Sequence, residues 1–234
     1  MPSAPPVIAL SGVAKTFVLH VQGGARLPVL AGCALSVHAG ECVALAGPSG
    51  AGKSTVMRLV HGNYLAQAGT IRVCGLDVAR ASPREILALR RRSLGYVSQF
   101  LRVLPRVPTL EVVAEPLLAL GVPRAQAEAR ARDLLARLNV PERLWSLSPM
   151  TFSGGEQQRV NLARGFAHPF PALLLDEPTA SLDPVNRTVV LDLILEAKAR
   201  GAAILGIFHD AAARAQVCDR EVDVSAFAPA PVPA

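Results

Sequence analysis

The stretch "GPSGAGKST", Gly47 to Thr55, decides the fold of this 234-residue chain. It satisfies G-x-x-x-x-G-K-[ST] and lies between "ECVALAG", which reads as a buried strand, and "KSTVMRLVHG", which reads as a helix ending at Gly62. Glycines are needed because backbone N–H groups must wrap closely around phosphate oxygens, where a Cβ would obstruct them. The motif predicts that Lys53 supplies charge to the β- and γ-phosphates of a nucleotide and that Ser54 offers a hydroxyl to Mg²⁺. The predicted nucleotide-binding residues of this loop are Gly47, Pro48, Ser49, Gly50, Ala51, Gly52, Lys53, Ser54 and Thr55.

Two later apolar runs end in polar side chains. "PALLLDEP" brings Asp176 and Glu177 to the end of a strand, and "GAAILGIFHD" does the same for His209, with the helical "NRTVVLDLILEAKARG" between them. A parallel sheet collects a nucleotide site at the C-terminal ends of its strands, so Asp176 is predicted to hold Mg²⁺ through water. Taken alone, such an acidic pair is more often a strand end or a helix cap, and only the phosphate loop reverses that preference.

The middle of the chain differs in kind from its flanks. From about residue 108 to 139 it reads as helices, including "RAQAEARARDLLARLN" with Leu134, Leu135 and Leu138 on one face, whereas "TIRVCGLDV" earlier reads as an alternating strand with a turn at Gly75. We therefore expect an α/β protein with an inserted helical subdomain.

The chain is expected to form one domain with short tails. Residues 7–226 are assigned to the domain, its core to 7–98 and 160–226, and the helical subdomain to about 99–159. The two low-complexity ends are predicted to be disordered. They are "MPSAPP", residues 1–6, and "FAPAPVPA", residues 227–234.

Composition narrows the possible partners. The net charge of +6 and the pI near 9.7 come mostly from arginine spread along the chain, without the aromatic and basic clusters that stack bases, so nucleic-acid binding is not expected. No apolar run approaches the about 18 residues of a membrane helix, and the start lacks the basic region of a secretory signal. The expectation is a cytoplasmic protein that does not itself insert into the membrane.

The cysteines suggest no metal site and no disulfide framework. Cys33, Cys42, Cys74 and Cys218 are far apart in sequence and form no C-x-x-C pair. Reduced, buried thiols are the expectation.

A third motif, "FSGGEQQRVNLARG", combines small residues with a helix start. Such a start offers free N–H groups and the positive end of the helix dipole, so a phosphate could dock on Ser153, Gly154 and Gly155. A plain helix N-cap is the alternative reading.

The order of these motifs carries a family resemblance. The phosphate loop, the "SQ" at Gln99, "SGGEQQR", "LLLDEP", "SLD" and the strand ending near His209 together resemble the ATP-binding-cassette (ABC) ATPases over nearly the whole chain. The resemblance implies a P-loop NTPase with a RecA-like core, an N-terminal antiparallel β subdomain and the inserted helical subdomain. It also implies a second cassette, arranged head to tail, with each ATP held between the phosphate loop of one cassette and the "SGG" of the other. Whether that second cassette is another copy or a sister chain stays open.

The same resemblance implies roles for single residues. Phe17 would stack on adenine, Gln99 would contact Mg²⁺ and the attacking water, Glu177 would act as base, His209 would sense the γ-phosphate, and Asp183 would carry the signal across the dimer. Without the family, a lone Phe or His is usually structural. The residues expected to complete the partner's ATP site are Ser153, Gly154, Gly155, Glu156 and Asp183, and the expected Mg²⁺ ligands are Ser54, Gln99 and Asp176. Glu156 departs from the glutamine common at this position, and hydrolysis is expected to survive the change.

The segment "SQFLRVLPRVPTLEVVAEPL", which starts at Ser98, is where a cassette is expected to contact the protein that it drives. This stretch, "TFVLHVQGGARLPVL", "FSGGEQQRVNLARGF" and "AILGIFHDAAARAQVCDREVDV" resemble the L-type ATPase subunits of the bacterial carbon-phosphorus lyase system. That implies soluble lyase subunits as partners and a supporting role in forming ribose 1-phosphonate 5-triphosphate from ATP and a phosphonate. The alternative is the ATPase of a lipoprotein-releasing or macrolide-export transporter. Five arginines could dock on an acidic partner or form a solvated face: Arg90, Arg91, Arg92, Arg102 and Arg106.

Overall fold

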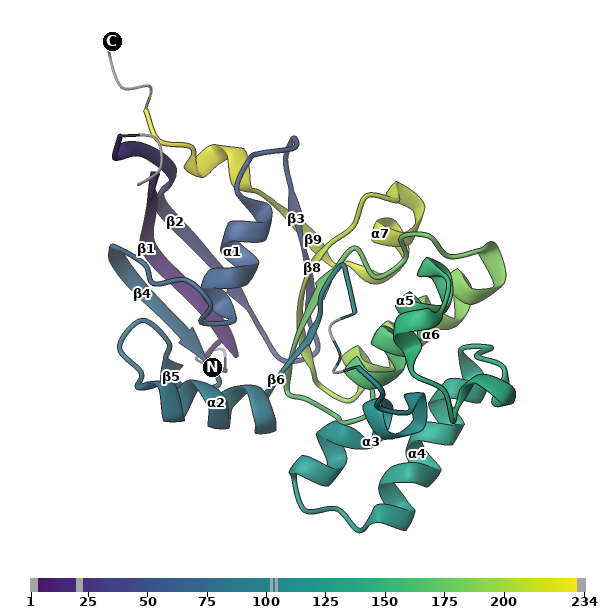
Figure 1. Ribbon diagram of the computed structural model, residues 1–234. Coiled ribbons are helices and arrows are strands. Elements are labelled where there is room, and N and C mark those ends of the chain that lie inside the picture. The colour runs from purple at the N-terminus through teal and green to yellow at the C-terminus, as the bar shows by residue number, and fades with distance from the viewer. Residues whose placement is uncertain (1–3, 20–22, 102, 104, 231–234) are drawn as a thin grey trace.

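The computed structural model describes residues 4–19, 23–101, 103 and 105–230, and its strands form two sheets within them (Figure 1). The antiparallel sheet has the order β2 (Ala25–Val37), β1 (Ile8–Leu19), β4 (Ala68–Val73) and β5 (Leu76–Asp77). The parallel sheet has the order β6 (Leu94–Val97), β7 (Ala172–Asp176), β8 (Ala203–Ile207), β3 (Cys42–Ala46) and β9 (Arg220–Asp223). Both sheets of the expected fold class are therefore present.

The α-helices are α1 (Lys53–Val60), α2 (Pro83–Arg92), α3 (Thr109–Ala119), α4 (Arg124–Arg137), α5 (Gly154–Gly165), α6 (Pro184–Ala199) and α7 (Ala211–Val217). Helices α1, α3, α4, α5 and α6 fall in segments predicted to be helical, whereas α2 and α7 were not predicted. The 3-10 helices are η2 (Glu142–Leu144), η3 (Pro149–Thr151) and η4 (Val224–Phe227). Helix α6 starts two residues before the predicted Asn186, because the side chain of Asp183 caps it by accepting from the Asn186 N–H at 2.9 Å.

The parallel sheet separates two hydrophobic cores. Alternate residues of β7 point to opposite faces, so Leu173 and Leu175 join the core formed with the helices, while Ala172 and Leu174 join the core shared with the antiparallel sheet. All of them are buried, which explains why "ALLLD" reads as a continuous apolar run.

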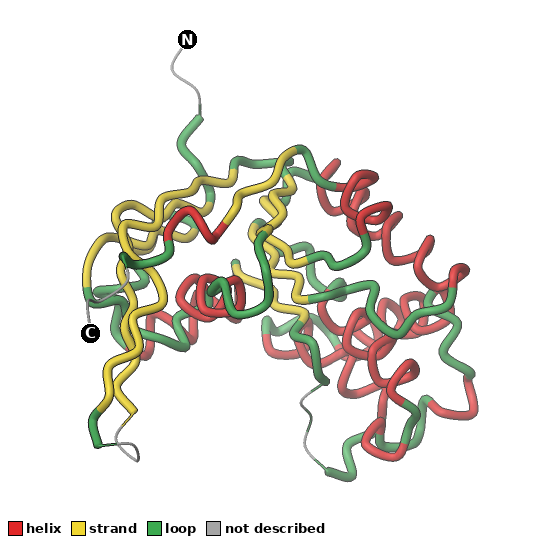
Figure 2. Tube along the Cα trace, turned by 90° about the horizontal axis from the view of Figure 1, so that it is seen from above, coloured by secondary structure: helices red, strands yellow, loops and turns green. Residues whose placement is uncertain are grey.

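Helix α1 fills the space between the two sheets. It contacts β4 of the antiparallel sheet and β7 and β8 of the parallel sheet, and Val56, Met57, Leu59 and Val60 are buried in the shared core. Figure 2 shows the strands gathered on one side of the molecule and most helical turns on the other. The residue at the start of α1, Lys53, is thereby fixed at the carboxyl end of β3.

The inserted helices pack on one another beyond the parallel sheet. Helices α3, α4 and α5 contact each other, and Leu134, Leu135 and Leu138 are fully buried, as their spacing predicts (Figure 1). Helix α5 also contacts β6, so it joins the insert to the core. The exact division at residues 98 and 159 stays a prediction.

The structure describes part of each predicted tail, residues 4–6 and 227–230. Phe227 closes η4 and packs against the core, so order extends into the segment predicted to be a disordered tail. Residues 1–3 and 231–234, and also Arg102, lie outside the described residues. No helix in the described part of the chain has the length and apolarity needed to cross a membrane.

Candidate functional site

The phosphate loop connects β3 to α1 through backbone conformations that favour glycine. Gly47, Gly50 and Gly52 have φ values of 124°, 82° and 101°. A Cβ on Gly47 would lie 3.2 Å from the Oδ1 atom of Asp223, so this close approach also restricts the position to glycine. The Nζ of Lys53 donates to the carbonyl of Gly47 at 2.6 Å and to that of Pro48 at 2.9 Å, which folds the cation over the loop.

A cavity of about 370 Å³ brings the phosphate loop together with distant parts of the chain. Its lining residues are Phe17, Leu27, Val29, Ser49, Gly50, Gly52, Lys53, Ser54, Thr55, Glu177, Ile207 and His209. The strand-end residues Glu177 and His209 and the aromatic Phe17 thus share one site with the loop, as the sequence predicts. The predicted Gln99, Asp176 and Ser153 are not among the lining residues.

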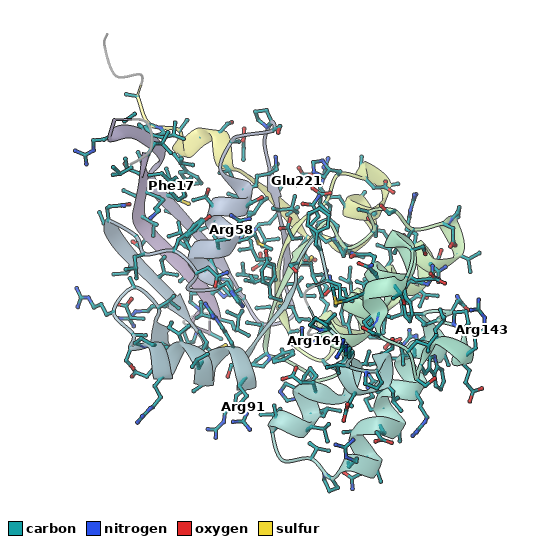
Figure 3. The ribbon with its side chains drawn as sticks, viewed as in Figure 1. Phe17, Arg58, Arg91, Arg143, Arg164 and Glu221 are labelled. Atoms are coloured by element: carbon teal, nitrogen blue, oxygen red, sulfur yellow. The ribbon has the colours of Figure 1, made fainter. Side chains whose placement is uncertain are left out.

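Phe17 lies at the far end of β1, on the antiparallel sheet (Figure 3). Its ring meets that of Tyr64 edge to face, with centroids 5.1 Å apart, and the Nζ of Lys15 lies 4.9 Å from its centroid. The ring is half-buried, so these neighbours hold it at the edge of the cavity. Stacking on adenine remains a prediction.

Glu177 holds a cluster of three predicted catalytic side chains. Its Oε1 lies 2.8 Å from Nε2 of His209, and its Oε2 accepts from Nε2 of Gln99 at 3.5 Å. Its φ of 55° is uncommon for a residue with a Cβ, and such conformations concentrate at functional sites. The side chain of Glu177 is only 23% exposed, whereas that of His209 is 66% exposed. A carboxylate is therefore fixed between an amide and an imidazole next to the phosphate loop.

Asp176 is the buried neighbour of this cluster. It ends β7, and Tyr96 donates its hydroxyl to Asp176 Oδ2 at 3.3 Å. Burial raises the pKa of Asp176, and the charge of Glu177 raises it further, whereas the Tyr96 hydrogen bond and Arg58 lower it. The net effect is a raised pKa, and the Tyr96 hydroxyl and the Arg58 charge offset only part of the effect of burial.

Replacing Tyr96 by Phe is expected to shift the acid limb of activity toward higher pH. The change removes the hydroxyl that lowers the pKa of Asp176, so this carboxyl protonates at a higher pH than in the unmodified chain. The measurement is the pH profile of ATP turnover at saturating Mg²⁺ for both proteins. Superimposable profiles would show that Tyr96 does not tune Asp176.

Ser153 caps α5 and is remote from the phosphate loop of its own chain. Its backbone N–H and hydroxyl donate to Oε2 of Glu156 at 2.9 and 2.7 Å, and its Oγ accepts from the Glu156 N–H at 3.4 Å. This capping box lowers the pKa of Glu156, chiefly through the Ser153 hydrogen bonds. Arg143, whose charge acts on Glu156, lies on the opposite side of the molecule from Phe17 (Figure 3). One chain therefore does not bring its own "SGG" to its own phosphate loop.

The departure at position 156 has a structural explanation. Glutamate and glutamine both serve at the third position of a capping box, because either side chain can accept from the backbone of the cap residue. Glu156 makes that bond. The residue type at this position is accounted for by the helix start alone.

Asp183 also acts as a cap. Its Oδ1 and Oδ2 accept from the backbone N–H and the side-chain amide of Asn186 at 2.9 and 2.6 Å, and it is exposed. A Cβ on Gly155 would lie 3.4 Å from the carbonyl of Ser181, so the "SLD" loop borders the start of α5. Gly155 thus lies against the "SLD" loop, and the contact of Gly154, Gly155 and Asp183 with a partner's ATP stays a prediction.

Comparison with known proteins decides the family. The family model described as ABC transporter matches residues 30–180. The chain belongs to the ABC transporter family. It is 41% identical over 205 residues to the lipoprotein-releasing system ATP-binding protein LolD of Maricaulis maris, a match that covers 87% of this chain and 88% of that protein.

Two further relatives extend the comparison. The macrolide export ATP-binding/permease protein MacB of Nitrobacter winogradskyi is 37% identical over 206 residues, which cover 88% of this cassette and 31% of that longer protein. The solved dimeric structure of the cassette MJ0796 bound to ADP and Pi has a TM-score of 0.84 and 26% identity, covering 93% of this cassette and 95% of that chain. The expected fold class is confirmed, and the cassette is an ABC-type ATPase.

Two residues near the site were not singled out in the sequence. Besides Tyr96, the buried Asn161 of α5 donates from Nδ2 to the carbonyl of Ser98 at 2.6 Å, and so fixes the backbone next to Gln99. A polar residue on the apolar face of a predicted helix is the signal that marks Asn161. Tyr96 gives no such signal, because a tyrosine in a strand is ordinary.

A larger cavity lies beside the segment around Ser98 and Gln99, here called the glutamine loop, rather than over the phosphate loop. It has a volume of about 740 Å³ and is lined in part by Arg91, Ser98, Pro116 and Arg164, between α2 and the inserted helices (Figure 3). Of the predicted basic cluster, Arg90 is engaged internally: its Nε and Nη2 donate to the carbonyl of His61 at 2.9 Å and to Asn63 Oδ1 at 2.6 Å. Arg91, Arg92 and Arg106 are exposed, so among the described arginines of this set Arg90 differs by its internal contacts.

Proposed function

We propose that this cassette is the ATPase subunit of a membrane transporter of the lipoprotein-releasing type. The observation that carries the proposal is the identity of 40–41% to lipoprotein-releasing ATP-binding proteins of several bacteria, over 88–90% of their length. Matches to export proteins that join cassette and permease in one chain point the same way. They favour a membrane-embedded permease as the partner and make macrolide-type export the nearest variant of the proposal.

The carbon-phosphorus lyase reading of the sequence receives less support than its alternative. The segments on which that hypothesis rests include the glutamine loop, the start of α5 at Ser153 and the strand that leads to His209. Each of these serves ATP hydrolysis, which all cassettes share, so they specify the chemistry more than the partner. We therefore replace soluble lyase subunits by a permease as the proposed partner.

The site residues fit a magnesium nucleotide. The Ser54 hydroxyl, the Asp176 carboxylate and the Gln99 amide are hard oxygen donors of the kind Mg²⁺ prefers. A bound ion would neutralise charge on the β- and γ-phosphates. Lys53, now folded onto the carbonyls of Gly47 and Pro48, would turn its ammonium to the phosphates.

Glu177 is proposed to act as the base. It would accept a proton from the water that attacks the γ-phosphorus, while the bond from that phosphorus to ADP breaks. Gln99 and His209 already contact the two carboxylate oxygens, so they would orient the base, and the exposed imidazole would reach the γ-phosphate.

Each ATP is proposed to lie between two copies of the cassette. Ser153 and its helix start do not line the phosphate-loop cavity of the same chain, while their N–H groups suit an anion. The dimeric MJ0796 cassette, with 26% identity, is a precedent for such pairing. The cavity beside Ser98 and Pro116, which borders the glutamine loop, is the proposed contact surface for the permease.

A capture experiment tests the partner. The tagged Glu177→Gln chain is expressed in its native host, membranes are solubilised with and without Mg²⁺-ATP, and bound proteins are identified by mass spectrometry. Specific recovery of an integral membrane permease is the expected result, with the Lys53→Ala chain as a control that loses any ATP-dependent part. Recovery of soluble carbon-phosphorus lyase subunits instead would restore the first reading.

A further inference from the structure

Two cysteines that are 176 residues apart in sequence lie in contact in the fold. The Sγ atoms of Cys42 and Cys218 are 3.5 Å apart. Cys42 is the first residue of β3, and Cys218 follows α7. Asp219 locks the two segments together, because its N–H donates to the Cys42 carbonyl at 2.8 Å and its Oδ2 accepts from the Cys42 N–H at 2.8 Å. The backbone groups of Cys42 are therefore hydrogen-bonded to the residue next to Cys218, and these bonds hold the two thiols close together.

This spacing suits a disulfide. A disulfide needs its Cα atoms about 4.4–6.8 Å apart and its sulfurs at about 2.05 Å, and neighbouring strands lie about 4.8 Å apart. Strands β3 and β9 pair in parallel from Val43 and Arg220 onward, one residue after Cys42 and two residues after Cys218. The sulfurs can close the remaining gap by rotating about the side-chain bonds while the strands keep their register.

The two thiols also differ in the way a reactive pair requires. Cys42 is fully buried, and its hydrogen bond to Cys218 raises its pKa, whereas the same hydrogen bond lowers the pKa of the half-exposed Cys218. Lys198 lies next to Cys218: its Nζ donates to the carbonyl of Val217 at 3.2 Å and to Asp219 Oδ1 at 2.6 Å. The hydrogen bond from Cys42, with a smaller contribution from Lys198, outweighs burial and the charges of Asp219 and Glu221, and so lowers the pKa of the more accessible sulfur. The thiolate of that sulfur is the attacking form.

We propose that Cys42 and Cys218 form a peroxide-oxidisable dithiol that closes to an intramolecular disulfide. The Cys218 thiolate attacks one oxygen of hydrogen peroxide, the O–O bond breaks, and the sulfenic acid forms as hydroxide leaves and takes up a proton to become water. The Cys42 sulfur then attacks the Cys218 sulfur, the S–O bond breaks, and the Cys42 proton leaves with the hydroxyl as water. Two thiols are oxidised by two electrons, and one hydroperoxide is reduced.

The disulfide would join the start of β3, which leads to the phosphate loop, to the end of α7, which follows His209. β3 runs directly into the phosphate loop, and α7 starts two residues after His209. Neither cysteine lines the ATP cavity, so the disulfide crosses behind the site and not through it. It closes a long loop of the chain, so it is expected to raise the melting temperature, by roughly 5–10 °C.

The test treats the whole purified chain with hydrogen peroxide and counts thiols after denaturation. The expected result is a fall from four titratable thiols to two, together with a non-reduced peptide that contains both Cys42 and Cys218, and a higher melting temperature that dithiothreitol reverses. Cys218→Ser should abolish the linked peptide and the rise. Cys74→Ser, at an exposed cysteine of the same chain, should keep both.

Three results would overturn the proposal. One is the persistence of four thiols after peroxide. Another is over-oxidation of Cys218 without a link to Cys42, which would show that the second sulfur cannot reach it. The third is a fall in melting temperature on forming the link, which would show that the disulfide does not fit the native arrangement. The Cys42→Ala chain, which deletes the buried partner, provides an independent check if Cys218→Ser lowers stability.

Discussion

Glu177→Gln is expected to lower ATP turnover by at least about 100-fold while ATP remains bound. Gln keeps the size of the side chain and can still hydrogen-bond to Gln99 and His209, which lie 3.5 and 2.8 Å from the carboxylate oxygens. It cannot accept a proton from water. The measurement is steady-state phosphate release, together with the amount of ATP and ADP that copurifies or is retained on a filter.

The matched control for this change is Glu142→Gln. Glu142 is an exposed glutamate in η2, away from the cavity, so the same loss of charge there should leave turnover unchanged. Normal turnover by Glu177→Gln would remove Glu177 from the role of base. Loss of ATP binding together with turnover would show that its main contribution is to hold the site and not to move a proton.

Ser153→Arg is expected to abolish hydrolysis without weakening ATP binding to the phosphate loop. Ser153 is exposed and does not line the cavity that contains Lys53, so an arginine there is expected to leave the binding cavity of its own chain intact. The larger side chain would instead occupy the place where the γ-phosphate of a partner's ATP is proposed to dock. Binding of a fluorescent ATP analogue and phosphate release, measured on the same preparation, separate the two effects.

The chain supplies a close control for the loss of the helix cap. Ser82 forms the same capping box at the start of α2, with contacts to Glu85 of 2.8, 2.7 and 3.4 Å against 2.9, 2.7 and 3.4 Å for Ser153 and Glu156. Ser82→Arg should therefore cost similar stability and leave hydrolysis intact. Equal loss of hydrolysis in both variants would attribute the effect of Ser153→Arg to a damaged helix.

Much of the fold was predictable because local patterns specify it. The phosphate loop needs glycine at positive φ, and β7 of the parallel sheet is a continuous apolar run. Helix α4 and its C-cap residue bury Leu134, Leu135 and Leu138. These signals lie within short windows of the sequence. The order of the sheets and the packing of α1 between them depend on contacts across the whole chain, and the motifs supply them only through the family resemblance.

The residues of the site also fall into a group that the sequence predicts and a group that it does not. Glu177 and His209 follow apolar strands that end at one edge of the sheet, so their approach to within 2.8 Å follows from topology. The tyrosine that donates to Asp176 and the asparagine that holds the Ser98 backbone depend on side-chain directions that no spacing rule supplies. The contact of Cys42 with Cys218 is equally hidden, because 176 residues separate them.

The most direct test of a shared ATP site is the mass of the Glu177→Gln chain in solution, measured by light scattering with and without Mg²⁺-ATP. We expect a monomer of 24.6 kDa without nucleotide, a dimer with it, and no dimer when Ser153→Arg is added to the same chain. A double variant that still doubles its mass with ATP would contradict the proposal that Ser153 completes the partner's site.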